Sequence, residues 1–128
     1  MNGYFSLIQF CPVMERREAA NVGVLLIVPE TGYATAKVTH DHARLRRMFG
    51  KQAGEPQAVA VLLRSIAGRI VTEKDSLATL EGLRHFIATR ANRLLLTQPR
   101  AVLVEAHPDA TLQELMDELV VPGEAVGA

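Results

Sequence analysis

The first third of the chain alternates between apolar segments and polar turns in a pattern that predicts three β-strands. Tyr4 to Cys11 is rich in aromatic and aliphatic side chains, and Pro12 ends this strand because proline cannot donate to a β-ladder. Asn21 to Val28 is almost entirely apolar, which predicts a central strand buried on both faces. Pro29-Glu30-Thr31-Gly32 is a turn signal, and extended character resumes over Tyr33 to Thr39. We therefore expect the second and third strands to form a hairpin.

Two residues of the predicted second strand carry further information. Gly23 has no side chain to pack, so it predicts a bulge or a close approach by another backbone or a ligand. Asn21 lies where a polar loop enters this strand, and its amide can tie the loop backbone down. A central second strand would thereby hold the charged loop before it rigid.

The chain from Asp41 onward is mostly helical in pattern. Asp41 can cap a short basic helix that runs to about Phe49 and ends at Gly50. Glu55-Pro56 opens a longer helix with apolar residues at helical spacing, namely Val59, Leu62, Leu63, Ile66 and Ile70. A third helix is predicted to begin near Asp75 or Ser76, to stop near Asn92, and to present Leu80, Leu83, Ile87 and Ala91.

The last third predicts further strands and a final helix, and it fixes the expected fold class. Leu94 to Leu96 and Ala101 to Val104 predict one or two strands, and Thr111 to Glu114 has the spacing of a capping box. The following helix is expected to bury Leu112, Leu115, Met116 and Leu119. The expected fold is α+β, a small, mainly antiparallel sheet of three N-terminal strands plus one or two later strands, packed with about four helices. We expect one domain over residues 1–121 and a flexible tail over residues 122–128.

Composition narrows the class of protein. The single cysteine, Cys11, excludes an internal disulfide, and the N-terminus has no signal-peptide pattern. The longest apolar run, Val22 to Pro29, is far shorter than the roughly 18 residues of a membrane helix. These features favour a cytoplasmic protein without membrane contact.

Charge is unevenly distributed along the sequence. Residues 1–100 hold all 14 Lys and Arg and 8 Asp and Glu, net +6, whereas residues 101–128 hold 6 Asp and Glu, net −6. Either the acidic final helix pairs with basic side chains of the same domain, or the basic surface meets an acidic partner or nucleic acid.

The most distinctive polar segment lies between the first two predicted strands. Arg16, Glu18 and Asn21 offer a cation, an anion and an amide within six residues. The arginine fork can hold a carboxylate or a phosphate through two parallel hydrogen bonds. The segment is therefore either a salt-bridged loop that fixes the crossing between strands or a binding surface for a protein or ligand.

This segment carries a resemblance to a known family. Ser6 to Pro12 reads Ser-Leu-Ile-Gln-Phe-Cys-Pro, and Arg16 to Leu26 reads Arg-x-Glu-Ala-Ala-Asn-Val-Gly-Val-Leu-Leu. Both resemble the bacterial family DUF3037, a domain of unknown function, most closely over about the first 40 residues. Members often place Asp after the Cys-Pro, where this chain has Val13, so a site that needs this Asp is altered here. Members are often encoded beside proteins with a HipA-like kinase domain, so the resemblance implies a partner role beside such a kinase in a toxin–antitoxin-like or defence setting.

Other candidate constellations are weaker. His40 and His42 flank Asp41 at the end of a predicted strand, where side chains no longer alternate between the two faces. We therefore interpret them as surface or capping histidines and not as metal ligands. Cys11 at the end of an aromatic strand is typical of a small buried hydrophobe. We therefore predict no catalytic residue, no metal site and no cofactor. The basic helix candidate for phosphate contact consists of Arg44, Arg46 and Arg47.

The sequence leads to three functional hypotheses. The first is a non-enzymatic accessory or protein-interaction domain that works with a HipA-like kinase, with Arg16, Glu18 and Asn21 as the candidate binding loop. The second is a nucleic-acid-binding or processing protein that uses Arg44, Arg46 and Arg47. The third, a small hydrolase or nuclease, needs Glu18 and a histidine in one pocket. Oligomeric state stays open, because a homo-oligomer could form if the first strand is a sheet edge.

Overall fold

A computed structural model describes residues 1–39, 41–89 and 93–120 of the chain. Over these residues the fold is α+β, with an antiparallel sheet in the order β3-β2-β1-β4 and β5 also paired to β1. The strands are β1 (Asn2–Phe10), β2 (Ala20–Val28), β3 (Tyr33–Val38), β4 (Leu94–Leu96) and β5 (Arg100–Leu103). The α-helices are α1 (His42–Phe49), α2 (Pro56–Thr72), α3 (Lys74–Leu77), α4 (Leu80–Ala88) and α5 (Pro108–Leu119). Two 3-10 helices, η1 (Met14–Arg16) and η2 (Gly50–Ala53), complete the order.

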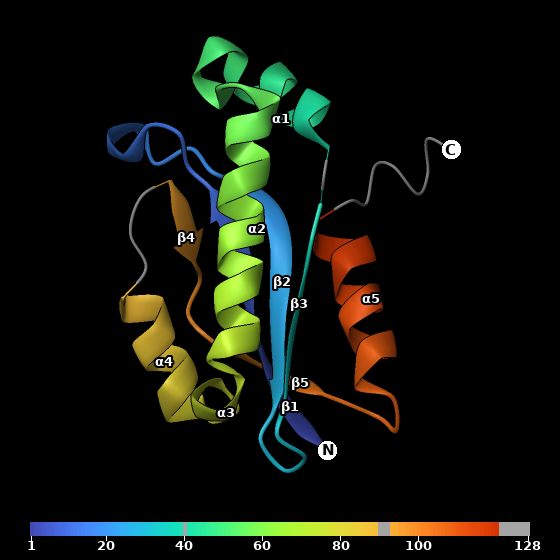
Figure 1. Cartoon of the computed structure of the whole chain (residues 1–128). Helices are drawn as coiled ribbons and strands as arrows, with labels where there is room; N and C mark the ends of the chain where they lie inside the picture. The colour runs from blue at the N-terminus through green and yellow to red at the C-terminus, as the bar shows by residue number, and fades with distance from the viewer. Residues whose placement is uncertain (40, 90–92, 121–128) are drawn as a thin grey trace.

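Helices cover both faces of the sheet. Figure 1 shows α2, α3 and α4 on one side of the sheet and α5 on the other. Strand β2 sends Val22, Leu25 and Ile27 to the cluster that includes α1 to α4. It sends Val24, Leu26 and Val28 to the cluster shared with α5. Eight of its nine residues are buried, so the prediction of a strand buried on both faces is confirmed.

Gly23 combines the two features that the sequence allowed. Ile8 pairs with Gly23 and Gln9 with Asn21, so Val22 is an extra residue that forms a bulge in β2. A Cβ on Gly23 would lie 2.6 Å from the carbonyl oxygen of Lys37 in β3. The glycine therefore permits a close approach of neighbouring backbone, and the bulge shifts the alternation of buried faces by one residue.

The possibility that the first strand is a sheet edge is wrong. Strand β1 pairs with β2 along one side and with both β4 and β5 along the other. Ile8 pairs with Leu96 and Tyr4 with Ala101, about ninety positions away in sequence in each case. Local pattern cannot reveal such a partner, because hydrogen bonding between strands depends on how the chain returns. β3 lies at one edge of the described sheet, and β4 and β5 share the other.

The predicted helix from residue 75 or 76 onward is two helices. α3 ends at Leu77, and the Thr79 hydroxyl accepts a hydrogen bond of 2.9 Å from the Gly82 amide to start α4. The break lets the Ser76 carbonyl approach Gly82 so closely that a Cβ there would lie 1.7 Å from its oxygen. The predicted positions Ala91 and Asn92 lie outside the described residues.

The start of the final helix also differs from expectation. α5 begins at Pro108 rather than at Thr111, and its N-cap, His107, makes no side-chain capping bond. Proline suits the first helical turn, because a backbone N–H at that position would have no acceptor within the helix. Leu112, Leu115 and Met116 are buried as predicted, whereas Leu119 is only half-buried. The expected flexible tail over residues 122–128 lies outside the described residues. None of the helices in the described part of the chain combines the length and hydrophobicity needed to cross a bilayer.

A tyrosine joins the edge strand to α5 and gives a pH-dependent prediction. The Tyr33 hydroxyl donates to Asp109 Oδ1 over 2.6 Å. Burial and then this hydrogen bond raise the pKa of Tyr33 from 10.0 to about 12. Because the folded pKa is raised, the stabilisation is complete below about pH 10 and is lost as the pH rises through 12. In a Tyr4→Phe background, tyrosinate absorbance should show a midpoint near 12, and Asp109→Asn should lower it. A midpoint near 10 would contradict the contact.

Candidate functional site

The loop before β2 is a compact turn built on β1. The amide of Cys11 donates to the Arg93 carbonyl oxygen over 2.7 Å, and the Cys11 thiol donates to the Val13 carbonyl oxygen over 3.6 Å. The one-turn helix η1 follows and ends at Arg16, and the next residue, Arg17, has a φ of 55°, the left-handed conformation. The Arg17 amide donates back to the Met14 carbonyl oxygen over 3.2 Å. These bonds fix a loop that projects Met14 and Arg16 to solvent.

Arg16 and Glu18 form the ion pair that the sequence allowed. Arg16 Nε lies 2.9 Å from Glu18 Oε1, and both side chains are more than half exposed. Arg16 Nη1 also donates to Gln52 Oε1 of η2 over 3.1 Å. An exposed pair of this kind contributes little to stability, about 0–1 kcal/mol. The hydrogen bond from Arg16 to Gln52 holds the loop against η2.

Asn21 faces a different part of the protein. Its Oδ1 accepts from Gln9 Nε2 over 2.9 Å, and its Nδ2 donates to the Leu119 carbonyl oxygen over 3.0 Å. It therefore bridges β1, β2 and the end of α5. Arg16, Glu18 and Asn21 do not converge on one site, because Asn21 bonds to α5 while Arg16 bonds to η2.

The basic helix candidate is divided in the same way. Arg44 Nη2 donates to the Asn21 carbonyl oxygen over 2.9 Å, and Arg44 Nη1 is buried with no hydrogen-bond partner in the described part of the chain. Arg46 and Arg47 are exposed. The structure thus brings Arg44 to Asn21, a pairing that the sequence did not suggest, and leaves Arg46 and Arg47 as the solvent-facing pair.

The described histidine and cysteine candidates, His42 and Cys11, make contacts within the fold. His42 lies 3.1 Å from the Gly54 carbonyl oxygen through its Nε2, and Cys11 is buried. His40 lies outside the described residues. Among the described residues, no three His, Cys, Asp or Glu side chains form a group that could hold a metal ion.

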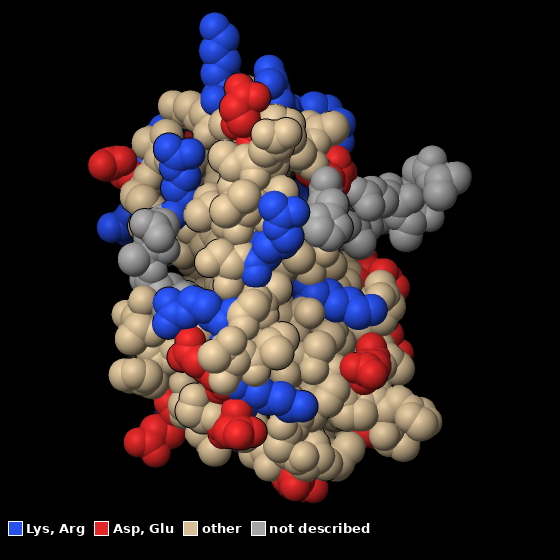
Figure 2. All heavy atoms as spheres, in the orientation of Figure 1, with Lys and Arg blue, Asp and Glu red and all other residues tan. Residues whose placement is uncertain are grey.

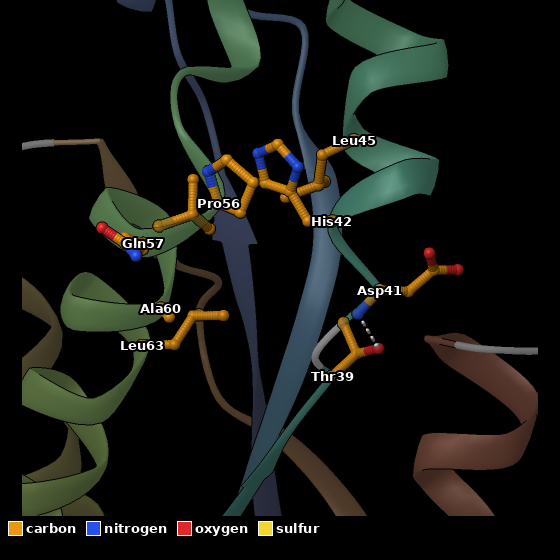
Figure 3. A pocket seen from close by; sticks show the side chains of 9 residues that line it. Thr39, Asp41, His42, Leu45, Pro56, Gln57, Ala60 and Leu63 are labelled. Carbon is orange, nitrogen blue, oxygen red and sulfur yellow. Dashed lines mark hydrogen bonds between the residues drawn. The ribbon is translucent and has the colours of Figure 1, made fainter.

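A cavity of about 290 Å³ lies between the starts of α1 and α2. Figure 3 shows the His42 ring beside Pro56, with the Asp41 carboxylate and the Gln57 amide pointing away from it on opposite sides. The dashed hydrogen bond runs from the Asp41 amide to Thr39 Oγ1 over 3.2 Å. Glu18 does not line this cavity, so the pairing of Glu18 with a histidine that a hydrolase or nuclease would need is not present there.

Sequence reasoning missed a second hollow, which we call the loop–α2 groove. It has a volume of about 1000 Å³ and is lined by Pro12, Val13, Met14, Glu15, Ala58, Val61, Leu62 and Arg93. Met14 is 47% exposed and Val61 55% exposed, which makes both unusual among the large apolar residues. The signal in the sequence was Val61, which falls outside the apolar stripe that α2 turns to the core. The loop residues that complete the groove could not be identified from the sequence, because the loop reaches α2 only in the folded chain.

Charge is separated along the molecule. Figure 2 shows more Lys and Arg toward the end where α1 lies and more Asp and Glu toward the end with the β2–β3 hairpin. Arg46, Arg47 and Lys51 are exposed near the first end. Among the described residues the ion pairs are Arg16–Glu18 and Arg69–Glu73, so the expected pairing of the acidic final helix with basic side chains is not found there.

Comparisons with known proteins agree with the resemblance carried by the loop. The family model described as "Protein of unknown function (DUF3037)" matches residues 5–120, which extends well beyond the N-terminal motifs. No curated protein and no solved structure matches the chain. Because the match spans nearly all of the fold, from β1 to the end of α5, the chain belongs to the DUF3037 family.

Proposed function

We propose that this chain is a non-enzymatic protein-interaction domain that contacts its partner through the loop–α2 groove. The observation that carries the proposal is the pair of exposed apolar side chains, Met14 of η1 and Val61 of α2, that line the groove. Apolar groups that line a hollow and face water are typical of an interaction surface. The polar groups that line the groove are Glu15 and Arg93, one acid and one base, which suits an apolar contact with a charged rim.

The character of the two hollows supports binding over catalysis. The cavity beside His42 is lined mainly by apolar side chains, and its carboxylate and amide point outward (Figure 3). The groove has no histidine, cysteine or serine in its lining. Glu18 lines neither hollow, so the pairing of Glu18 with a histidine that the hydrolase or nuclease hypothesis needs is not found in them.

The proposed partner is a HipA-like kinase, the class of neighbour that the family resemblance implies, in a toxin–antitoxin-like or defence setting. Arg16 and Glu18 are exposed in the same loop, just after the groove-lining Glu15, and Asn21 bonds the end of the loop to α5. The proposal therefore assigns the exposed pair to the rim and Asn21 to support.

A matched pair of methionine variants tests the proposal. Met14→Asp puts a charge into the groove, whereas Met48→Asp makes the same change at a methionine on α1 that is 52% exposed. When the tagged chain is co-expressed with a HipA-like kinase, the wild type and Met48→Asp should recover the kinase. Met14→Asp should recover at least about tenfold less kinase, because a charge placed at a central contact residue removes the binding free energy which that residue contributes. Equal recovery by both variants, or recovery of the wild type as a lone monomer, would contradict the proposal.

Nucleic-acid binding is the second candidate, and it now depends on Arg46 and Arg47, since Arg44 is engaged with Asn21. The same co-expression should leave the Arg46→Ala plus Arg47→Ala variant with full kinase recovery. If nucleic acid were the partner, this double variant and not Met14→Asp would lose salt-dependent binding to single-stranded DNA or RNA.

A further inference from the structure

Helix α2 has a second helical face that the described residues leave uncovered. Its buried residues are Val59, Leu63, Ile66 and Ile70. The exposed residues Ala58, Val61, Ser65 and Gly68 recur at intervals of three, four and three, so they lie on one face, which we call the outer α2 face. In Figure 1 no other helix crosses in front of α2, and in Figure 2 uncharged atoms make up most of the surface over it, with Lys and Arg side chains on and beside it. Ala58 and Val61 also line the loop–α2 groove, so groove and face are continuous.

Gly68 has no explanation within the described fold. A Cβ at this position would meet nothing within 4 Å, in contrast to Gly23 and Gly82, where neighbouring atoms exclude one. Glycine is a poor helix former, so a glycine in the middle of a 17-residue helix weakens it. A small residue on an open helix face is useful where the backbone of a second helix approaches closely.

The charged residues within α2 itself are all basic. Arg64 and Arg69 flank the face on opposite sides, and no Asp or Glu occurs between Pro56 and Thr72. Glu73, just after the helix, pairs with Arg69 over 3.0 Å, and Glu55 lies just before its start. In helix pairs the residues that flank the contact face select the partner by charge. If two copies of α2 packed through this face, arginine would lie opposite arginine, so charge repulsion disfavours self-association.

We infer that the outer α2 face binds an acidic amphipathic helix of a partner protein, with carboxylates on that helix facing Arg64, which forms no ion pair with the described residues, whereas Arg69 already pairs with Glu73. This inference rests on the proposed function and names the chemistry of its partner. The apolar side of the incoming helix would lie over Val61 and the small residues around Gly68, and its end would reach the loop–α2 groove. Salt should weaken the complex, because charge pairs at the edge of a helix contact are screened.

Two synthetic peptides provide the test with the full chain. Each is an amphipathic helix of about three heptads with leucine and alanine on the contact face. One carries glutamate at every flanking position, and the other carries lysine at the same positions. Fluorescence anisotropy of labelled peptides should show that the glutamate peptide binds at least about tenfold more tightly than the lysine peptide at low salt. Equal affinities, or no binding of the glutamate peptide, would overturn the inference.

Variants locate the binding. Arg64→Glu should weaken binding of the glutamate peptide at least about tenfold, whereas Arg84→Glu, the same charge change on the exposed side of α4, should leave it within about twofold. Gly68→Leu should also abolish tight binding, because its side chain fills the approach path, and circular dichroism will show that the fold is kept. A dimer in sedimentation that Gly68→Leu disrupts would assign the face to a second copy and overturn the inference.

The two proposals fail separately. If kinase recovery depends on Met14 but neither peptide binds, the interaction domain stands and the acidic-helix inference falls. If the glutamate peptide binds with the stated dependence on Arg64 while no kinase is recovered, the chemistry of the face stands and the identity of the partner is wrong.

Discussion

Replacing Gly23 with valine is expected to lower the free energy of unfolding by about 3 kcal/mol or more, because the site has no room for a side chain. A Cβ at Gly23 would lie 2.6 Å from the Lys37 carbonyl oxygen and 2.9 Å from Val38 Cγ1. The first of these atoms belongs to the backbone of β3, which is held by its ladder with β2. The strand pair must separate to admit the new side chain, and both core clusters meet at β2.

The measurement is urea unfolding of Gly23→Val followed by far-ultraviolet circular dichroism. Gly68→Ala is the matched glycine control, since nothing lies within 4 Å of its added Cβ. This control should gain up to about 1 kcal/mol from the higher helix propensity of alanine. A Gly23→Val chain with an unchanged unfolding midpoint would show that the β2–β3 contact is not as close as described.

Asn21→Ala should lower the free energy of unfolding by about 2 kcal/mol, because two hydrogen bonds in a half-buried setting are lost together. The variant leaves Gln9 Nε2 without its 2.9 Å acceptor and the Leu119 carbonyl oxygen without its 3.0 Å donor. Asn21→Asp keeps the shape and the acceptor but removes the donor to Leu119. It should destabilise α5 as well, since a carboxylate then faces a carbonyl oxygen.

Glu18→Ala is the control within the same loop. Its carboxylate is 60% exposed and pairs with Arg16, so its loss should change the free energy of unfolding by less than about 0.5 kcal/mol. Chemical denaturation of the three variants decides between a supporting and a binding role. If Asn21→Ala unfolds like the wild type while Glu18→Ala does not, Asn21 is not the anchor of the loop.

The sequence predicted the elements whose signals are local. Asp41 accepts a hydrogen bond from the Arg44 amide, and Gly50 ends α1 with a φ of 60°, as the short basic helix requires. Pro56 opens α2, and the apolar spacing of that helix identifies its buried face. Each signal lies within a few residues of the structure it specifies, so short-range backbone and side-chain preferences are enough.

The candidate site was less accessible from sequence. Arg16, Glu18 and Asn21 are close along the chain, but the left-handed turn at Arg17 and the entry into β2 send them in different directions. Asn21 is completed by Leu119, 98 residues away. Met14 and Val61 line the same groove although they are 47 positions apart in the chain. The outer α2 face can be identified only once the buried face of that helix is known.

The sequence by itself determined the α+β class, the doubly buried second strand, the starts of α1 and α2 and the family, because these depend on residue type and spacing within short windows. Only the folded structure shows that β1 is central, that Arg44 donates to the Asn21 carbonyl oxygen, and that Met14 and Val61 line one groove. These depend on contacts between residues far apart in the chain. The energy of such contacts is gained only once the whole core has formed, so no single segment encodes them.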